Sequence, residues 1–320
     1  MGFLNFTWRP EITPDEQAFA CMKAAIAGGA TRWSTAYAYG PPDNPGAGLQ
    51  LLGRYFAQHP EDAAKVTLFV RGCIAGAPPL LRPATSRAEV LASAAECAAL
   101  LGPNKRMDIF GPARMDDGNV PVEETAAALR ELVGRGEVGA AGLSEVSAET
   151  IRRACAVVPI AAVEEELSLW STEILTNGVA EVCRENGVEI WAYAPLGYGF
   201  LTGQIRRFED IPEGDLRRML GRFRGENFNK NLDLVDKVEE FAARKGVKPA
   251  QLALAWVRAH SEVGNCGTII PIPGTTSPAK VEENCRPVPL SAEEKAELDK
   301  ILASISVVGH RSVPEMPEIC

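Results

Sequence analysis

The stretch Trp33-Ser34-Thr35-Ala36-Tyr37-Ala38-Tyr39-Gly40 joins a short apolar strand to a loop that carries a tyrosine and a glycine. The same order recurs along the chain: a strand, then a loop with chemically useful residues, then a helix. Loops of this kind gather at one end of a parallel barrel, where that fold places its active site. The stretch therefore predicts that Tyr39 is a functional residue at the end of a strand.

Eight segments have the pattern of buried strands, and helical patterns separate them. Because no long linker or break in composition interrupts the alternation, the sequence predicts an α/β fold, a single (β/α)₈ TIM barrel spanning residues 1–320. The alternative, a doubly wound open sheet, needs a glycine-rich phosphate turn after the first strand, and Arg9-Pro10-Glu11 is not one. The expected strands are residues 4–8, 31–35, 66–70, 107–110, 138–143, 160–163, 189–193 and 268–271.

Composition narrows the classes of function. The chain has 320 residues, of which 46% are hydrophobic and 23% charged, as is typical of a globular protein with a sizeable core. Its net charge of -9 argues against nucleic acid or an anionic membrane as a partner. No apolar run reaches about 18 residues and no signal-like N-terminus is present, so we expect a cytoplasmic protein that acts on a small molecule.

Cysteine and histidine usage argues against disulfides and metals. The eight cysteines are scattered without a CxxC pair, which favours reduced thiols that fill the core. The three histidines, His59, His260 and His310, are far apart and not at the spacing of metal ligands. We therefore expect neither a metal site nor a histidine-based triad.

Two features of the sequence suggest chemical roles for residues near the expected strand ends. Tyr39 and Arg71 follow consecutive strands, and a nearby permanent cation stabilises a phenolate, which helps a tyrosine act as an acid. The alternative is a surface tyrosine beside a solvated arginine. The second feature is a run of arginines in one irregular stretch, which suggests phosphate recognition, although a solvated face would look the same. These are Arg206, Arg207, Arg217, Arg218, Arg222 and Arg224.

Four motifs together resemble the aldo-keto reductase superfamily, over nearly the whole chain. Residues 34–40 (STAYAYG) resemble its D-T-A-x-x-Y-G motif, and residues 108–116 (DIFGPARMD) resemble D-L-x-x-x-H-x-x-D. Residues 192–199 (AYAPLGYG) are similar to A-Y-S-P-L-G-x-G. Ile272-Pro273-Gly274-Thr275-Thr276 with residues 280–284 (KVEEN) resembles I-P-G-T…R-L-E-E-N. Trp8-Arg9-Pro10 and residues 222–228 look closest to fungal pyridoxal reductases.

The resemblance implies an NADPH-dependent carbonyl reductase. Tyr39 would be the general acid, and nicotinamide would stack on Tyr193. Ser144 and Glu164 occupy positions that contact the carboxamide, and Leu196 lies near the pyrophosphate. Thr275 and Lys280 would meet the 2′-phosphate, and Glu283 and Asn284 the adenine. The expected cofactor-binding set is completed by Gly197, Arg222 and Gly274.

The chain departs from the superfamily's catalytic tetrad. Ser34 stands where the family has aspartate, Arg71 where it has lysine, and Ala113 where it has histidine, so we expect Tyr39, Arg71 and Ser34 to form a degenerate site. Losing one positioned donor costs on the order of 10²-fold in rate. Three functions stay open: a reductase of a specialised carbonyl or enone; a barrel redirected to isomerisation, dehydration or cyclisation in metabolite biosynthesis; and a non-catalytic binding protein.

Overall fold

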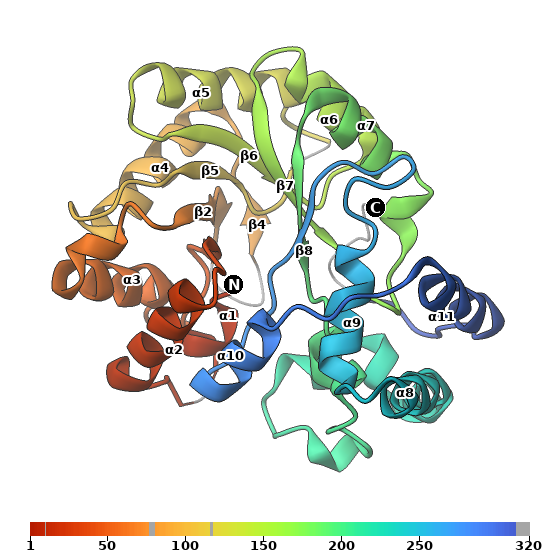
Figure 1. Cartoon of the computed structure of the whole chain (residues 1–320). Coiled ribbons are helices and arrows are strands. Elements are labelled where there is room, and N and C mark those ends of the chain that lie inside the picture. Colours follow the sequence, from red (N-terminus) through yellow and green to blue (C-terminus); the bar gives the residue numbers. More distant parts are fainter. Residues whose placement is uncertain (10, 77–80, 116–117, 312–320) are drawn as a thin grey trace.

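Parallel strands form the centre of the molecule. The computed structural model describes residues 1–9, 11–76, 81–115 and 118–311. Its main sheet has seven strands whose neighbours are all parallel, and it curves inside a ring of helices (Figure 1). Their order in the sheet is β1 (Arg32–Ala36), β2 (Thr67–Gly72), β5 (Ile109–Pro112), β6 (Ala140–Ser144), β7 (Ile160–Glu166), β8 (Glu189–Tyr193) and β9 (Ile269–Pro271).

Residues 1–3 take the eighth position and close the barrel. Gly2 forms a parallel bridge with Ser34 of β1, and the Phe3 amide donates to the Ser34 carbonyl at 3.0 Å. On its other side, the Gly2 amide donates to the carbonyl of Pro273, just after β9, at 3.1 Å. This segment therefore lies between the first and last strands of the sheet. The (β/α)₈ barrel expected from the sequence is confirmed.

The strand expected at residues 4–8 is wrong, because that segment begins with a short helix, α1 (Leu4–Thr7). Phe3 and Phe6 pack with ring centroids 5.4 Å apart, a contact that one helical turn provides between residues three apart. A short apolar run does not distinguish a strand from a buried helix by periodicity alone. The other seven expected strands overlap the observed ones.

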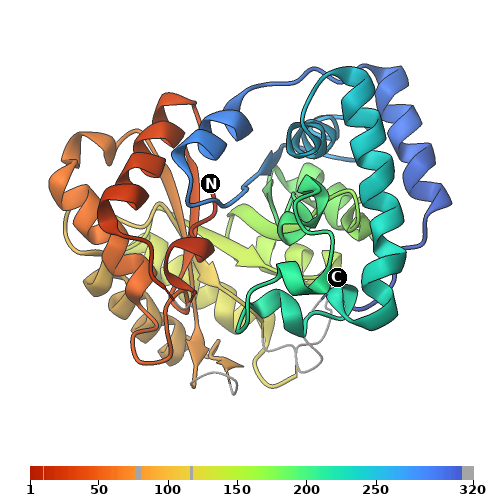
Figure 2. The ribbon, with the colours of Figure 1, turned by 90° about the horizontal axis from the view of Figure 1, so that it is seen from below.

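Helices and turns fill the connections between strands. The β3–β4 hairpin (orange) and the irregular region after β8 (green) lie along the lower edge of Figure 2, which is the end of the barrel where the strands stop. The helices are α2 (Asp15–Ala27), α3 (Ala47–Gln58), α4 (Arg87–Leu101), α5 (Val122–Gly134), α6 (Ala148–Cys155), α7 (Val179–Asn186), α8 (Gly225–Lys245), α9 (Pro249–Arg258), α10 (Pro278–Cys285) and α11 (Ala292–Ser304). The shorter elements are β3 (Ile74–Ala75), β4 (Arg82–Pro83) and the 3₁₀ turns η1 (Pro60–Asp62), η2 (Glu173–Leu175), η3 (Gly197–Thr202), η4 (Phe208–Asp210), η5 (Leu216–Met219) and η6 (Gly221–Phe223).

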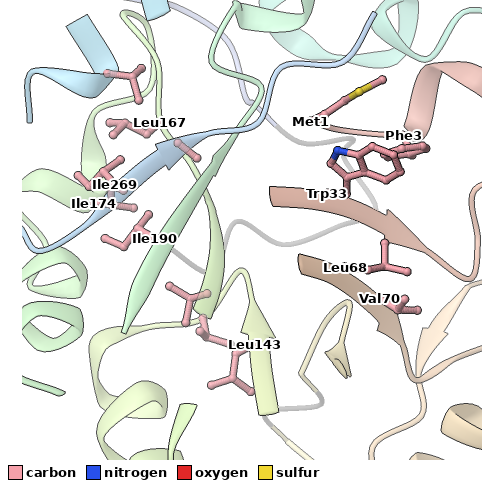
Figure 3. Packing of buried hydrophobic residues seen from close by; sticks show 14 of the residues in the cluster. Met1, Phe3, Trp33, Leu68, Val70, Leu143, Leu167, Ile174, Ile190 and Ile269 are labelled. Carbon is pink, nitrogen blue, oxygen red and sulfur yellow. The ribbon is translucent and has the colours of Figure 1, made fainter. Parts of the chain in front are cut away.

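Alternation of side chains along the strands creates two apolar layers. Outward-facing residues such as Trp33, Leu68 and Ile190 pack between the strands and the helices, and Figure 3 shows Trp33 beside Met1 and Phe3. Burying each large apolar side chain stabilises the fold by about 1.5–3 kcal/mol. The inward-facing residues form a second cluster inside the barrel: Phe69, Ile109, Ala162, Trp191 and Ile272.

Two inward glycines make room for this inner cluster. A Cβ at Gly142 would lie 2.4 Å from the Phe69 ring, and one at Gly111 would lie 1.8 Å from the carbonyl oxygen of Gly142. Real Cβ atoms essentially never approach other atoms so closely. The spacing of β5 and β6 around Phe69 therefore depends on both glycines.

The cysteines of the described residues are free thiols. None of the seven cysteines in the described ranges forms a disulfide, and five are buried: Cys21, Cys73, Cys97, Cys183 and Cys266. The eighth, Cys320, lies outside those ranges. No helix within them is both long enough and apolar enough to cross a membrane.

Candidate functional site

The polar site lies at the carboxyl ends of the strands. Four inward-facing polar residues lie toward this end of β1, β2, β6 and β7, and all of them are buried: Ser34, Arg71, Ser144 and Glu164. Parallel strands end at the same edge, so the four side chains lie toward one end of the barrel, near inner apolar residues such as Phe69 and Ala162. Tyr39 joins them from the loop after β1.

The backbone is also strained at this rim. Cys73, Glu145 and Ala194 directly follow β2, β6 and β8, and their φ angles are 58°, 52° and 47°. Tyr198, in the loop after β8, has a φ of 54°. Residues without glycine's freedom rarely adopt such angles, and they cluster at functional sites. This strain therefore points to the same end of the barrel as the polar side chains.

Tyr39 and Arg71 meet at the rim. Arg71 Nη2 donates a hydrogen bond to Tyr39 Oη, and the guanidinium carbon lies 5.3 Å from the centre of the tyrosine ring. The carbonyl of Tyr39 accepts from Thr7 Oγ1 at 2.5 Å and from the Gly48 amide at 3.0 Å. These contacts hold the loop so that the phenol faces the guanidinium.

Glu164 and Ser34 complete a buried cluster with Arg71. Arg71 Nε and Glu164 Oε2 form an ion pair at 3.1 Å, and Ser34 Oγ donates to Glu164 Oε1 at 2.5 Å. Arg71 Nη2 also lies 3.5 Å from Ser34 Oγ. Burial lowers the pKa of Arg71, but the charges of Glu164 and Tyr39 outweigh it, so that its pKa is raised overall. Ala113, at the end of β5, adds no side-chain donor to this cluster.

A second charged cluster lies beside Tyr193, and sequence reasoning missed most of it. Tyr193 Oη donates to Glu145 Oε1 at 2.7 Å. Arg311 reaches Glu145 Oε2 at 2.9 Å, Glu166 Oε2 at 3.3 Å and Tyr193 Oη at 3.3 Å. Glu145 follows Ser144, and Glu166 is the last of three consecutive glutamates at positions 164–166. Their position at the end of a predicted strand was the only sequence signal for these two residues. Nothing in the sequence near Arg311 indicated its place at the rim.

Burial dominates the electrostatics of Glu166. It raises the pKa of this carboxyl from 4.5 to about 7, although Arg222 and Arg311 act in the opposite direction. Burial is also the main reason why the pKa of Tyr193 lies well above its usual value. The polar groups at the rim are therefore removed from water, and this loss of hydration disfavours their charged forms.

The remaining expected cofactor residues lie in the segments that follow β8 and β9. Leu196 and Gly197 start η3, and Arg222 is buried with its guanidinium 5.3 Å from the ring of Trp170. Thr275 Oγ1 accepts from the Ser277 amide at 3.2 Å, and Lys280 Nζ donates to Gln204 Oε1 at 3.1 Å. The others are close in sequence to the start of α10: Gly274 precedes it, and Glu283 and Asn284 belong to it.

The residues at the mouth fit a dinucleotide in two places. Ser144 Oγ is buried and has no hydrogen-bond partner among the described residues, as expected of a hydroxyl that contacts a carboxamide. At the other place, the N-terminus of α10 and the ammonium of Lys280 offer a positive site for a phosphate.

The arginine run interacts largely within the protein. Arg206 pairs with Asp236 at 2.6 Å, Arg217 pairs with Asp215 at 2.7 Å, and the Arg218 guanidinium carbon lies 4.8 Å from the Phe208 ring. Arg207, Arg222 and Arg224 also contact groups of the chain itself. These contacts hold the irregular region between η3 and α8. Two residues of the motifs, Pro10 and Asp116, lie outside the described residues.

Comparisons with known proteins agree with this architecture. The model of the Aldo/keto reductase family matches residues 1–303. The chain is 37% identical over 317 residues to probable pyridoxal reductase 2 of Schizosaccharomyces pombe, covering 97% of this chain and 93% of that protein. It is 35% identical over 334 residues to the putative pyridoxal reductase of Saccharomyces cerevisiae, covering 97% and 94%.

One further relative is named with a cofactor, and one solved structure has a similar fold. The S. pombe protein named aldo-keto reductase yakc, whose name carries NADP(+), is 44% identical over 201 residues, covering 62% of this chain and 58% of that protein. The structure of a glycerol dehydrogenase from Gluconobacter oxydans superposes with a TM-score of 0.79 at 22% identity, covering 99% of this chain and 93% of that one. The fold and the matches define a (β/α)₈-barrel oxidoreductase. The chain belongs to the aldo-keto reductase family.

Proposed function

We propose that the chain is an NADPH-dependent reductase of a small, specialised carbonyl or enone metabolite. Tyr39 is the proton donor, and Arg71 assists it. The observation that carries this proposal is the contact between Arg71 Nη2 and Tyr39 Oη at the rim. Two relatives are named pyridoxal reductases and one is named with NADP(+), which supports a carbonyl substrate and this cofactor.

Tyr39 delivers a proton to the substrate oxygen as the carbonyl is reduced. The phenolate that remains is stabilised by the guanidinium of Arg71, which stays charged throughout. Bound NADPH supplies a hydride to the carbonyl carbon. Because Ala113 adds no donor, Tyr39 and Arg71 carry the stabilisation of the developing oxyanion. Ser34 belongs to the site through its contacts with Glu164 and Arg71.

Tyr193 would hold the nicotinamide ring, and the unpartnered hydroxyl of Ser144 would contact its carboxamide. Thr275 and Lys280 would hold the 2′-phosphate, which would favour NADPH over NADH. The other residues of this proposed site are Leu196, Gly197, Arg222, Gly274, Glu283 and Asn284.

Titration of the protein with NADPH, followed by cofactor fluorescence, tests the binding half of the proposal. NADPH oxidation with a panel of carbonyl compounds that includes pyridoxal tests the catalytic half. In Tyr39→Phe we expect binding to be kept and oxidation to fall by about 10²- to 10⁴-fold. A wild-type protein that neither binds NADPH nor oxidises it with any carbonyl would contradict the proposal.

One observation favours a second candidate, a non-redox reaction such as isomerisation, dehydration or cyclisation. Arg311 contacts the hydroxyl of Tyr193, on which nicotinamide is expected to stack. The Tyr39–Arg71 pair would suffice to polarise an oxyanion in such a reaction. Turnover by protein freed of cofactor would favour it, whereas oxidation of one NADPH for each product formed would exclude it.

A further inference from the structure

Glu164 stands at the centre of the buried cluster rather than at its edge. It comes from β7, on the far side of the barrel from β1 and β2, which carry Ser34 and Arg71. Its side chain is fully buried, and each of its carboxylate oxygens faces one of those two residues. The carboxylate therefore joins opposite strands and contacts the guanidinium that donates to the Tyr39 phenol.

Arg71 depends on the Glu164 carboxylate for a counter-charge. The arginine side chain is only 8% exposed, and a buried charge without a partner costs several kcal/mol. Ser34 is neutral, so it does not compensate the guanidinium. Glu164 Oε2 is 3.1 Å from Arg71 Nε and supplies the opposite charge.

We propose that Glu164 provides, from β7, the counter-ion that holds Arg71 in place to donate to Tyr39, and that Ser34 orients this carboxylate. Glu164 is thus a positioning residue that acts through Arg71, and this inference rests on the proposed function. The contact at Nε is an ion pair by distance and lacks hydrogen-bond geometry, so the carboxylate restrains the position of the guanidinium mainly through its charge. Because the guanidinium is planar, restraining it beside Glu164 also restrains Nη2, which meets the phenol. Because both oxygens face Arg71 and Ser34, the carboxylate serves the arginine rather than a nicotinamide carboxamide.

The proposal is tested by removing the carboxylate at position 164 on β7 and introducing one at position 34 on β1. In Glu164→Gln the side chain keeps its shape and loses its charge, and we expect kcat to fall by about 10- to 100-fold, with little change in the Kd for NADPH. Ser34 Oγ lies 3.5 Å from Arg71 Nη2, so an aspartate at position 34 would reach the same guanidinium. The double variant S34D/E164Q should therefore recover most of the lost kcat. Ser34→Asp alone, which crowds two carboxylates around one cation, should lower it.

The titration of the Tyr39 hydroxyl gives a readout independent of turnover. If Glu164 positions Arg71, Glu164→Gln loosens the contact between the guanidinium and the phenol, and the tyrosine should ionise at higher pH than in the wild type. Loss of a negative charge with Arg71 still in place would shift the ionisation to lower pH, and that result would contradict the positioning role. Tyrosine-labelled NMR, assigned with Tyr39→Phe, measures this shift, and S34D/E164Q should reverse it. Tyr193 of β8, Arg114 after β5 and the Met1 amino group also act on this cluster, and all three are unchanged in these variants.

The control removes a similar carboxylate at the opposite end of the barrel. Glu189 pairs with Arg32 at 3.0 Å, and Glu189→Gln should leave both kcat and the Tyr39 titration unchanged. Unchanged kcat and unchanged Tyr39 titration in a folded Glu164→Gln protein would overturn the proposal. So would failure of S34D/E164Q to recover either quantity. If the wild type itself shows no reduction, the proposed function fails, and the Tyr39 titration alone decides whether Glu164 acts through Arg71.

Discussion

Arg311 Nη2 lies 2.9 Å from Glu145 Oε2, an ion pair that ties the last described residue of the chain to the loop after β6. The same guanidinium reaches Glu166 on β7 and the hydroxyl of Tyr193 on β8. Arg311 therefore helps to compensate two buried carboxylates at the rim, together with Arg222 beside Glu166.

Replacing this cation should destabilise the fold. In Arg311→Gln, Glu145 and Glu166 lose their shared partner, and breaking a buried ion pair costs about 3–5 kcal/mol. We expect the free energy of unfolding, from urea denaturation at pH 8, to fall by about that amount. Arg153→Gln, which removes an exposed pair with Glu123, should cost at most about 1 kcal/mol. Equal stabilities of the two variants would show that Arg311 is not structural.

Glu166 should make stability depend on pH. Its pKa is about 7 in the folded protein and 4.5 ordinarily, so the folded state binds the proton more tightly than the unfolded state. The resulting stabilisation is fully present below about pH 4.5 and is lost as pH rises through 7. The loss amounts to about 3 kcal/mol at 1.36 kcal/mol per pKa unit.

Glu166→Gln isolates this contribution. Urea denaturation of both proteins between pH 4.5 and 8 should show the wild type losing stability relative to the variant as pH rises. The difference should level off above pH 8, where Glu166 is ionised. A difference that stays constant with pH would mean that Glu166 titrates at its ordinary value.

Packing inside the barrel gives a third prediction. In Gly111→Ala the new methyl group would lie 1.8 Å from the Gly142 carbonyl oxygen on the neighbouring strand, so β5 and β6 must move apart. We expect a loss of at least about 3 kcal/mol, seen as a lower midpoint of thermal unfolding, or no folded protein. Gly134→Ala is the matched control, because a Cβ there meets nothing within 4 Å. An unchanged midpoint in Gly111→Ala would contradict the close approach of the two strands.

The sequence predicted the barrel because its signal is local and repeated. Short, largely apolar segments bounded by turn residues recur along the chain and alternate with helical patterns, which favours the barrel. Residues 4–8 are a segment of the same kind, and periodicity alone does not separate a strand from a buried helix in so short a run. Helix starts were equally local. Capping boxes form at Ser86 and Ser291, where a glutamate follows the serine three residues later.

The site was predicted only where it follows from strand order. Tyr39 follows β1 and Arg71 lies near the end of the neighbouring strand β2, so the barrel alone brings them near each other. The contact between Ser34 and Glu164 joins residues 130 positions apart, and that between Glu145 and Arg311 joins residues 166 apart. Such contacts depend on side-chain rotamers and on the path of the C-terminal segment, which no short motif encodes. The density of arginines after β8 was ambiguous because arginines serve folding and phosphate recognition alike.

Lys280 should determine the preference for binding NADPH over NADH. Its ammonium lies one turn into α10, and its present partner is the neutral side chain of Gln204, which a phosphate would outcompete. A hydrogen bond to a charged group is worth about 1.5–3 kcal/mol, so Lys280→Met should weaken NADPH binding by about 10- to 100-fold. NADH lacks the 2′-phosphate, and its affinity should change little. Fluorescence titration with each cofactor measures both effects, and Lys237→Met, which removes an exposed lysine of α8, is the control. Equal losses for NADPH and NADH would place the 2′-phosphate elsewhere, because only a group that contacts the phosphate separates the two cofactors.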